Sequence, residues 1–100
     1  MSIYELLKIE RPTVKESSLN IYMDSLRKAY HGIEGENIVP NSLSFLMKTD
    51  KVNEYLNQLK TDNTRKAYMN HIVVFLLLLN KIAPNPDIDV FIKDLRDRVE

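Results

Sequence analysis

The stretch Thr61–Leu79 reads TDNTRKAYMNHIVVFLLLL and joins a polar, basic start to an apolar end. Its first three residues are of types that cap helices. From Ile72 onward the run has no polar side, and a helix that is apolar all round must be buried. The stretch therefore predicts one long helix that ends near Lys81. Its second half should lie at the centre of a helical bundle, and its start is free to face a polyanion.

The composition favours a single all-α domain over residues 1–100. Two glycines and four prolines leave little material for hairpins, and no segment alternates like a strand. Hydrophobic residues make up 44% and charged residues 28% of the chain, as in globular domains. We therefore expect a compact bundle of four to five helices.

Several features bear on the cellular location. Without cysteine, the chain cannot be a disulfide scaffold, and it fits a reducing compartment. The N-terminus lacks a signal-peptide pattern, and the run Ile72–Leu79 is far shorter than the roughly 20 residues of a membrane span. We expect an intracellular protein, in the cytoplasm or nucleus or associated with a virus. It should be neither secreted nor bound to a membrane.

Two helices are predicted in the first third of the chain. A capping box at 2–5 indicates a short helix or arm within residues 1–12. A second helix is expected over 14–30. It should be opened by a second capping box at Thr13–Glu16 and stopped by Gly32.

The polar residues 31–42 predict a loop, after which a helix should run from Thr49 or Asp50, as its cap, to Lys60. The last helix, Asp87–Glu100, should be capped by its own first residue. Its apolar stripe consists of Ile88, Phe91, Ile92, Leu95 and Val99. We expect this stripe to pack on its own bundle, with self-association through residues 87–100 as the alternative. No stop signal ends this helix, so we also expect it to continue toward a catalytic domain.

Patterns for catalysis and for metal binding are missing from the sequence. The two histidines, His31 and His71, are far apart, and without cysteine a closed zinc site would need carboxylates. There is neither a glycine-rich phosphate loop nor a nucleophile elbow. We therefore expect no catalytic residue, cofactor, metal or small-molecule substrate. The chain by itself should not be an enzyme.

Nucleic-acid binding has the stronger pattern. The basic turn Asn63–Lys66 falls at a helix N-terminus, where free backbone amides and the helix dipole favour a phosphate. Although the whole chain is neutral, residues 60–86 carry four basic side chains against one acidic side chain. The simpler interpretation, an ordinary cap followed by a solvated basic turn, stays open.

Three motifs follow one another across residues 13–79. They are Ser18-x-x-x-Tyr22-x-x-x-Leu26, then Asp50-x-Val52-x-x-Tyr55-Leu56-x-x-Leu59, then Asn63-Thr64-Arg65-Lys66-x-Tyr68. Their order and spacing resemble the core-binding domain of tyrosine recombinases, the N-terminal, helical, SAM-like domain of phage-type integrases.

This resemblance implies a helical module that grips double-stranded recombination-site DNA. A separate domain would hold the catalytic arginines, histidine and tyrosine, so this chain would not cut DNA. The helix beginning near Thr64 would enter or border the major groove, with the helix bearing Ser17 and Ser18 as its partner. The DNA-contacting residues would be Lys15, Ser17, Ser18, Asn63, Thr64, Arg65, Lys66, Asn70 and His71.

A second interpretation stays open. The chain could be a helical protein-interaction domain of a mobile-element or viral accessory protein without catalytic activity. The neutral total charge and the amphipathic last helix favour this interpretation, whereas the basic turn Asn63–Lys66 favours DNA. Binding through phosphates must weaken steeply with salt, so a salt series separates the two.

Overall fold

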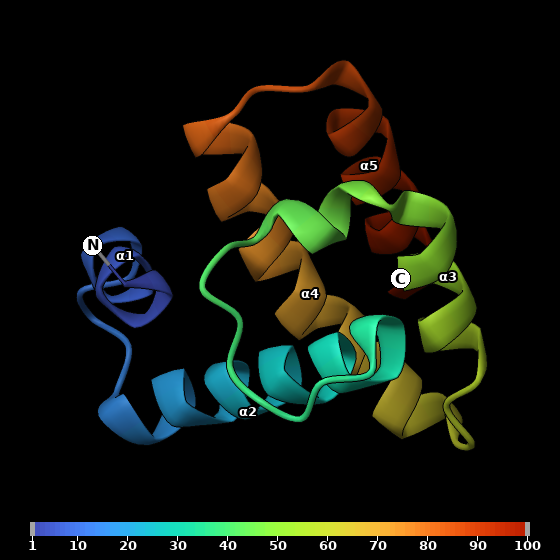
Figure 1. Ribbon diagram of the computed structural model, residues 1–100, viewed down its shortest axis with the longest axis horizontal. Coiled ribbons are helices and arrows are strands. Elements are labelled where there is room, and N and C mark those ends of the chain that lie inside the picture. Colours follow the sequence, from blue (N-terminus) through green and yellow to red (C-terminus); the bar gives the residue numbers. More distant parts are fainter. Residues whose placement is uncertain (1, 100) are drawn as a thin grey trace.

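The computed structural model describes residues 2–99 and contains only helices in that range (Figure 1). The elements are α1 (Ile3–Glu10), α2 (Glu16–Glu34), the short 3₁₀ segment η1 (Ser44–Met47), α3 (Thr49–Asn57), α4 (Asp62–Ile82) and α5 (Pro86–Val99). This confirms the all-α bundle expected from the sequence. None of the helices within residues 2–99 combines the length and apolar content needed to cross a membrane.

Helix α4 runs through the middle of the molecule and contacts each of the other four α-helices (Figure 1). Its buried side chains are Met69, Ile72, Val73, Phe75, Leu76, Leu78 and Leu79. Val74 and Leu77, on the remaining side, are partly buried against the same core. The apolar run is therefore enclosed on nearly every side, as its sequence predicts.

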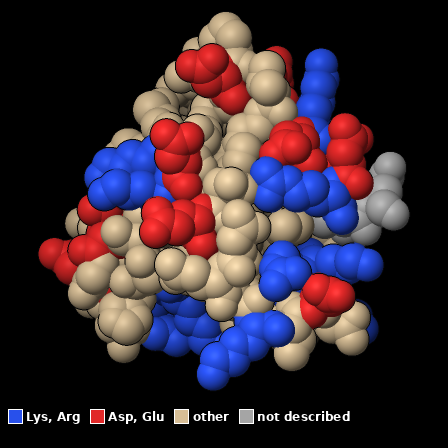
Figure 2. All heavy atoms as spheres, turned by 90° about the vertical axis from the view of Figure 1, so that its right-hand side faces the viewer, with Lys and Arg blue, Asp and Glu red and all other residues tan. Residues whose placement is uncertain are grey.

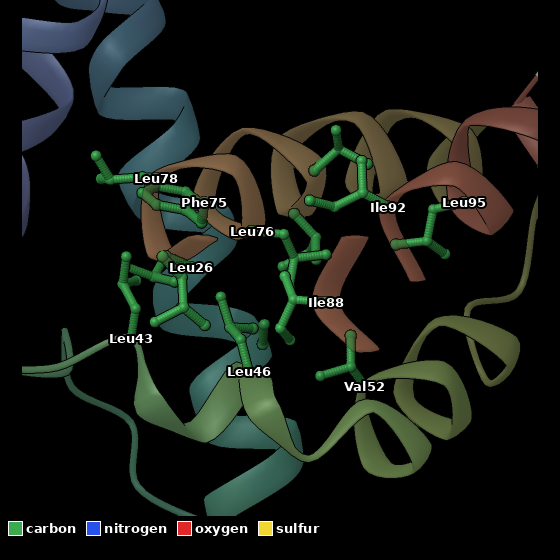
Figure 3. Close-up of a cluster of buried hydrophobic side chains, with 14 of the residues drawn as sticks. Leu26, Leu43, Leu46, Val52, Phe75, Leu76, Leu78, Ile88, Ile92 and Leu95 are labelled. Carbon is green, nitrogen blue, oxygen red and sulfur yellow. The ribbon is translucent and has the colours of Figure 1, made fainter. Parts of the chain in front are cut away.

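Helix α5 closes the bundle by packing mainly on α4 (Figure 3). Four residues of its predicted stripe are buried: Ile88, Phe91, Ile92 and Leu95. The side chain of Val99, the fifth, and all of Glu100 lie outside the described residues. The prediction that this stripe packs on its own bundle is confirmed for the four.

Two predicted caps are present as hydrogen bonds. The Ser2 hydroxyl accepts from the Glu5 amide at 3.2 Å and starts α1. The Thr61 hydroxyl accepts from the Thr64 amide at 3.2 Å and starts α4. Each bond satisfies one of the amide groups that the first turn of a helix leaves free.

The starts of α2 and α5 differ from the prediction. Helix α2 has Lys15 at its N-cap position, without a side-chain cap bond, so the predicted capping box beginning at Thr13 is wrong. Helix α5 begins at Pro86, and Asp87 is not its cap. The Asn85 side chain accepts from the Asp87 amide at 2.9 Å, and proline is well tolerated at the first helical position.

Helix α3 is shorter than predicted, because it ends at Asn57 rather than at Lys60. Its N-cap is Lys48, not Thr49 or Asp50. The Lys48 carbonyl already accepts from the amides of Lys51 and Val52, both at 3.0 Å. Helical hydrogen bonding therefore starts directly at the end of η1.

Gly32 does not stop α2, contrary to the prediction. The helix continues to Glu34 and ends at Gly35, which has a φ of 83° and donates to the His31 carbonyl at 2.9 Å. At Gly32, an added Cβ would lie 2.5 Å from the Tyr55 ring. Glycine at this position therefore lets α2 and α3 pack closely.

We expect Leu76→Ala to lower the free energy of unfolding by about 2–5 kcal/mol, because Leu76 is fully buried and its truncation leaves a cavity that the surrounding helices fill only in part. Denaturant unfolding followed by circular dichroism measures this change. Ile82→Ala, on the same helix but 57% exposed, is the matched control and should cost far less. A loss below about 1 kcal/mol for Leu76→Ala would contradict the central position of α4.

Candidate nucleic-acid interface

The first turns of α4 present a stripe of exposed residues. Asn63, Lys66, Ala67 and Asn70 are all exposed and follow the three- and four-residue spacing of one helix face. The Thr64 hydroxyl accepts from the Thr61 hydroxyl at 2.8 Å, so this side chain belongs to the cap. The stripe places two side-chain amides and one ammonium group on a single surface.

Arg65 holds the turn that precedes α4. Its guanidinium donates to the Leu59 carbonyl at 2.8 Å and to the Asp62 carboxylate at 2.9 Å. The Nε atom is buried without a hydrogen-bond partner. Two of the five N–H groups of this guanidinium therefore donate within the protein, and its predicted role as a phosphate contact remains a prediction.

The seam between α2 and α4 centres on His71. Its Nδ1 shares a hydrogen bond of 2.6 Å with the hydroxyl of Ser25, which is buried. The Tyr22 ring meets the imidazole edge-to-face, with ring centroids 5.0 Å apart, and the Tyr68 ring lies 6.2 Å away. Burial lowers the pKa of His71 below its ordinary value. Ser25 uses Nδ1, so a ligand at this imidazole would have to contact Nε2.

Lys28 extends this seam toward the start of α4. Its ammonium donates to the Tyr68 hydroxyl at 3.3 Å and pairs with Asp24 at 3.1 Å. The hydrogen bond to Asp24 raises the pKa of Lys28, so the side chain stays charged. Lys28 thereby adds a cation beside the exposed stripe of α4.

The predicted contact residues at the start of α2 lie elsewhere. The pairs Ser25–His71 and Lys28–Tyr68 show that α2 and α4 run in opposite directions along the seam. Lys15 is about 20 Å from Lys28 at the usual helical rise of about 1.5 Å per residue. Lys15 and Ser17 are exposed and Ser18 is half-buried at this far end. The structure therefore splits the predicted set into two groups at opposite ends of α2.

Charge is unevenly placed around the start of α4. In Figure 2, lysine and arginine side chains predominate along the lower part of the face, and acidic ones are more frequent above. The lower part corresponds to the turn before α4 and the end of α2 in Figure 1. Lys60 and Lys66 are exposed there, and neither forms an ion pair with another described residue. Both charges are available to a ligand.

Sequence reasoning missed Lys28 and Lys60 as parts of this surface, and it missed the buried Ser25 that supports His71. Lys60 directly precedes the cap of α4, so its position in the sequence was a usable signal. Ser25 and Lys28 come from α2, and only the packing of α2 on α4 brings them to His71 and Tyr68. Among residues 2–99, no three histidine, aspartate or glutamate side chains gather as a metal site.

Comparisons with known proteins give no relative for this chain. No protein-family model matches it, and neither the curated proteins nor the solved structures contain a significant match.

His71 should make the stability of the protein depend on pH. In the unfolded chain the imidazole of His71 binds a proton near pH 6.5. In the folded chain the same imidazole binds the proton only at lower pH, because burial lowers its pKa. The free energy of unfolding should therefore be highest above pH 6.5 and should decrease as the pH falls through this value. His71→Gln should remove this part of the decrease. Parallel curves for the two proteins in denaturant unfolding from about pH 7.5 to 5.5 would contradict this assignment.

Proposed function

We propose that the chain binds double-stranded DNA through the outer surface of the α2–α4 pair. The observation that carries this proposal is the exposed stripe of Asn63, Lys66 and Asn70 on the first turns of α4, flanked by Lys28 and Lys60. An α-helix with polar side chains on its exposed first turns fits the width of the DNA major groove.

The lysines and the asparagines of this surface suit different parts of the duplex. The ammonium groups of Lys60 and Lys66 suit phosphate oxygens, which set position and affinity. Asn63 and Asn70 suit base edges, since a side-chain amide can pair with adenine in the major groove. In this arrangement general affinity comes from the lysines, and sequence preference comes from the asparagines.

The packing of α2 on α4 supports a rigid surface. The Ser25–His71 hydrogen bond and the Tyr22–His71 ring contact tie the middle of α2 to α4. The guanidinium of Arg65 holds the turn before α4 in place by donating to the Leu59 carbonyl. A surface held by such contacts loses little conformational freedom on binding, which favours affinity.

We further propose that the chain is the DNA-gripping module of a tyrosine site-specific recombinase or integrase. Support comes from the order of the three motifs and from the small all-α bundle. In this proposal strand cleavage belongs to a separate catalytic domain, and this chain supplies positioning only. DNA as partner implies a location inside the cell or in association with a virus.

A protein-interaction domain is the second candidate function. The observation that favours it is a hollow between η1 and α5 that is lined in part by the exposed apolar side chains of Met47 and Val90. It lies on other elements than the α2–α4 surface, so the two functions do not exclude each other.

The double substitution Lys60→Ala with Lys66→Ala should weaken DNA binding for every duplex sequence. It should also reduce the slope of log affinity against log salt by about two, or about one for each lost phosphate contact. Fluorescence anisotropy with a labelled duplex over a salt series measures both effects. Arg65 is kept, because its loss would also disturb the turn before α4.

The matched control removes a lysine from a different helix. Lys93→Ala takes one exposed charge from α5 and should leave affinity and salt slope nearly unchanged. The proposal fails if the Lys60/Lys66 variant binds as tightly as the unmodified protein. A larger loss from Lys93→Ala would move the DNA surface to α5.

A further inference from the structure

A shallow hollow with an apolar floor and a partly polar rim lies between η1 and α5, on elements that the proposed DNA surface does not use. Its volume is about 500 Å³, and its lining includes Met47, Ile88, Val90 and Phe91. Ile88 and Phe91 are only 1% and 8% exposed, so the floor is part of the packed core. Met47 is 41% and Val90 66% exposed. The hollow is thus preformed, with apolar side chains left in water.

The exposure of Met47 and Val90 indicates the kind of occupant. A small molecule inside the hollow would leave much of these two side chains in water. A partner surface that extends beyond the hollow would cover both, as when an amphipathic helix lays its apolar face on a groove. Removing exposed aliphatic surface from water favours such an occupant.

The charges around the hollow indicate the chemistry of this partner. Asp87 and Asp94 line it, and no lysine or arginine does. Asp87 forms no ion pair within residues 2–99, and Asp94 pairs with Arg98 through one of its two oxygens. The unpaired carboxylate of Asp87, and to a lesser degree the remaining oxygen of Asp94, complement lysine or arginine side chains that flank an apolar one.

A second copy of the chain fits this surface poorly. In a two-fold symmetric dimer the same patch would meet itself, which brings the carboxylates of the two copies into one interface, and like charges repel. Contact with a basic surface elsewhere on a second copy would be head-to-tail, and such contacts build rings or open chains of molecules rather than a dimer. The observations therefore favour a different protein.

We propose that the hollow between η1 and α5 is a docking site for a cationic amphipathic helix of another protein. An apolar side chain of that helix sits between Met47 and Val90, and its lysine or arginine side chains lie against Asp87 and Asp94.

The test uses the full chain and a labelled synthetic helix with leucines on one face and lysines beside them. Its affinity is measured by fluorescence anisotropy. The same peptide with glutamates in place of the lysines should bind at least about tenfold more weakly. Val90→Ser should weaken binding of the lysine peptide about tenfold, whereas Val39→Ser, at another exposed valine, should not. The double change Asp87→Asn with Asp94→Asn should reduce both the affinity and its dependence on salt.

Three outcomes would overturn the proposal. The first is equal binding of the lysine and glutamate peptides. The second is unchanged affinity in Val90→Ser, with the fold verified by circular dichroism. The third is a dimer in light scattering that Val90→Ser converts to a monomer, since the occupant would then be a second copy. The proposal for DNA rests on α2 and α4 and is independent of all three.

Discussion

A helix with leucine, isoleucine and phenylalanine on every side cannot be left in water, because each such side chain gains about 1.5–3 kcal/mol on burial. The second half of α4 is such a helix, and the rest of the fold follows from the need to cover it. Each of the other four α-helices contacts α4, and α5 contributes four apolar side chains to this cover. A chain of 100 residues is long enough to do so.

The same constraint frees the other end of α4. Because the apolar half holds the helix in place, the first turns can project polar side chains without contributing to the core. The Arg65 contacts and the Ser25–His71 hydrogen bond fix these turns relative to α2. One continuous helix thus links the centre of the core to the surface that we propose for DNA.

Much of the fold could be predicted from the sequence, because the deciding patterns are local. The cap at Thr61, the burial of the run after Ile72 and the single stripe of α5 each depend on spacing within one helix. The failures are of two kinds. Some lie at helix ends, where several residues could serve as the cap, as at the starts of α2, α3 and α5. Others involve contacts between helices. Gly32 looked like a helix stop, but it is needed for close approach to the Tyr55 ring, which no local pattern indicates.

Some residues of the candidate site could be proposed from the sequence, whereas others depend on the packing of α2 on α4. Sequence reasoning proposed Asn63 and Lys66 from their place at a helix N-terminus and Asn70 through the family resemblance, and all three are exposed on one face of α4. The contributions of Ser25 and Lys28 depend on how α2 crosses α4, and the distance from Lys15 to this surface follows from the antiparallel course of the two helices. These relations exist only in three dimensions.

The most direct test of the account is amide chemical-shift mapping by NMR while a DNA duplex is added at low salt. The account predicts shifts concentrated between Asn63 and Asn70 and around Lys28, which reverse as salt is added. Shifts concentrated on η1 and α5, or no shifts at low salt, would contradict the claim that the α2–α4 surface binds DNA.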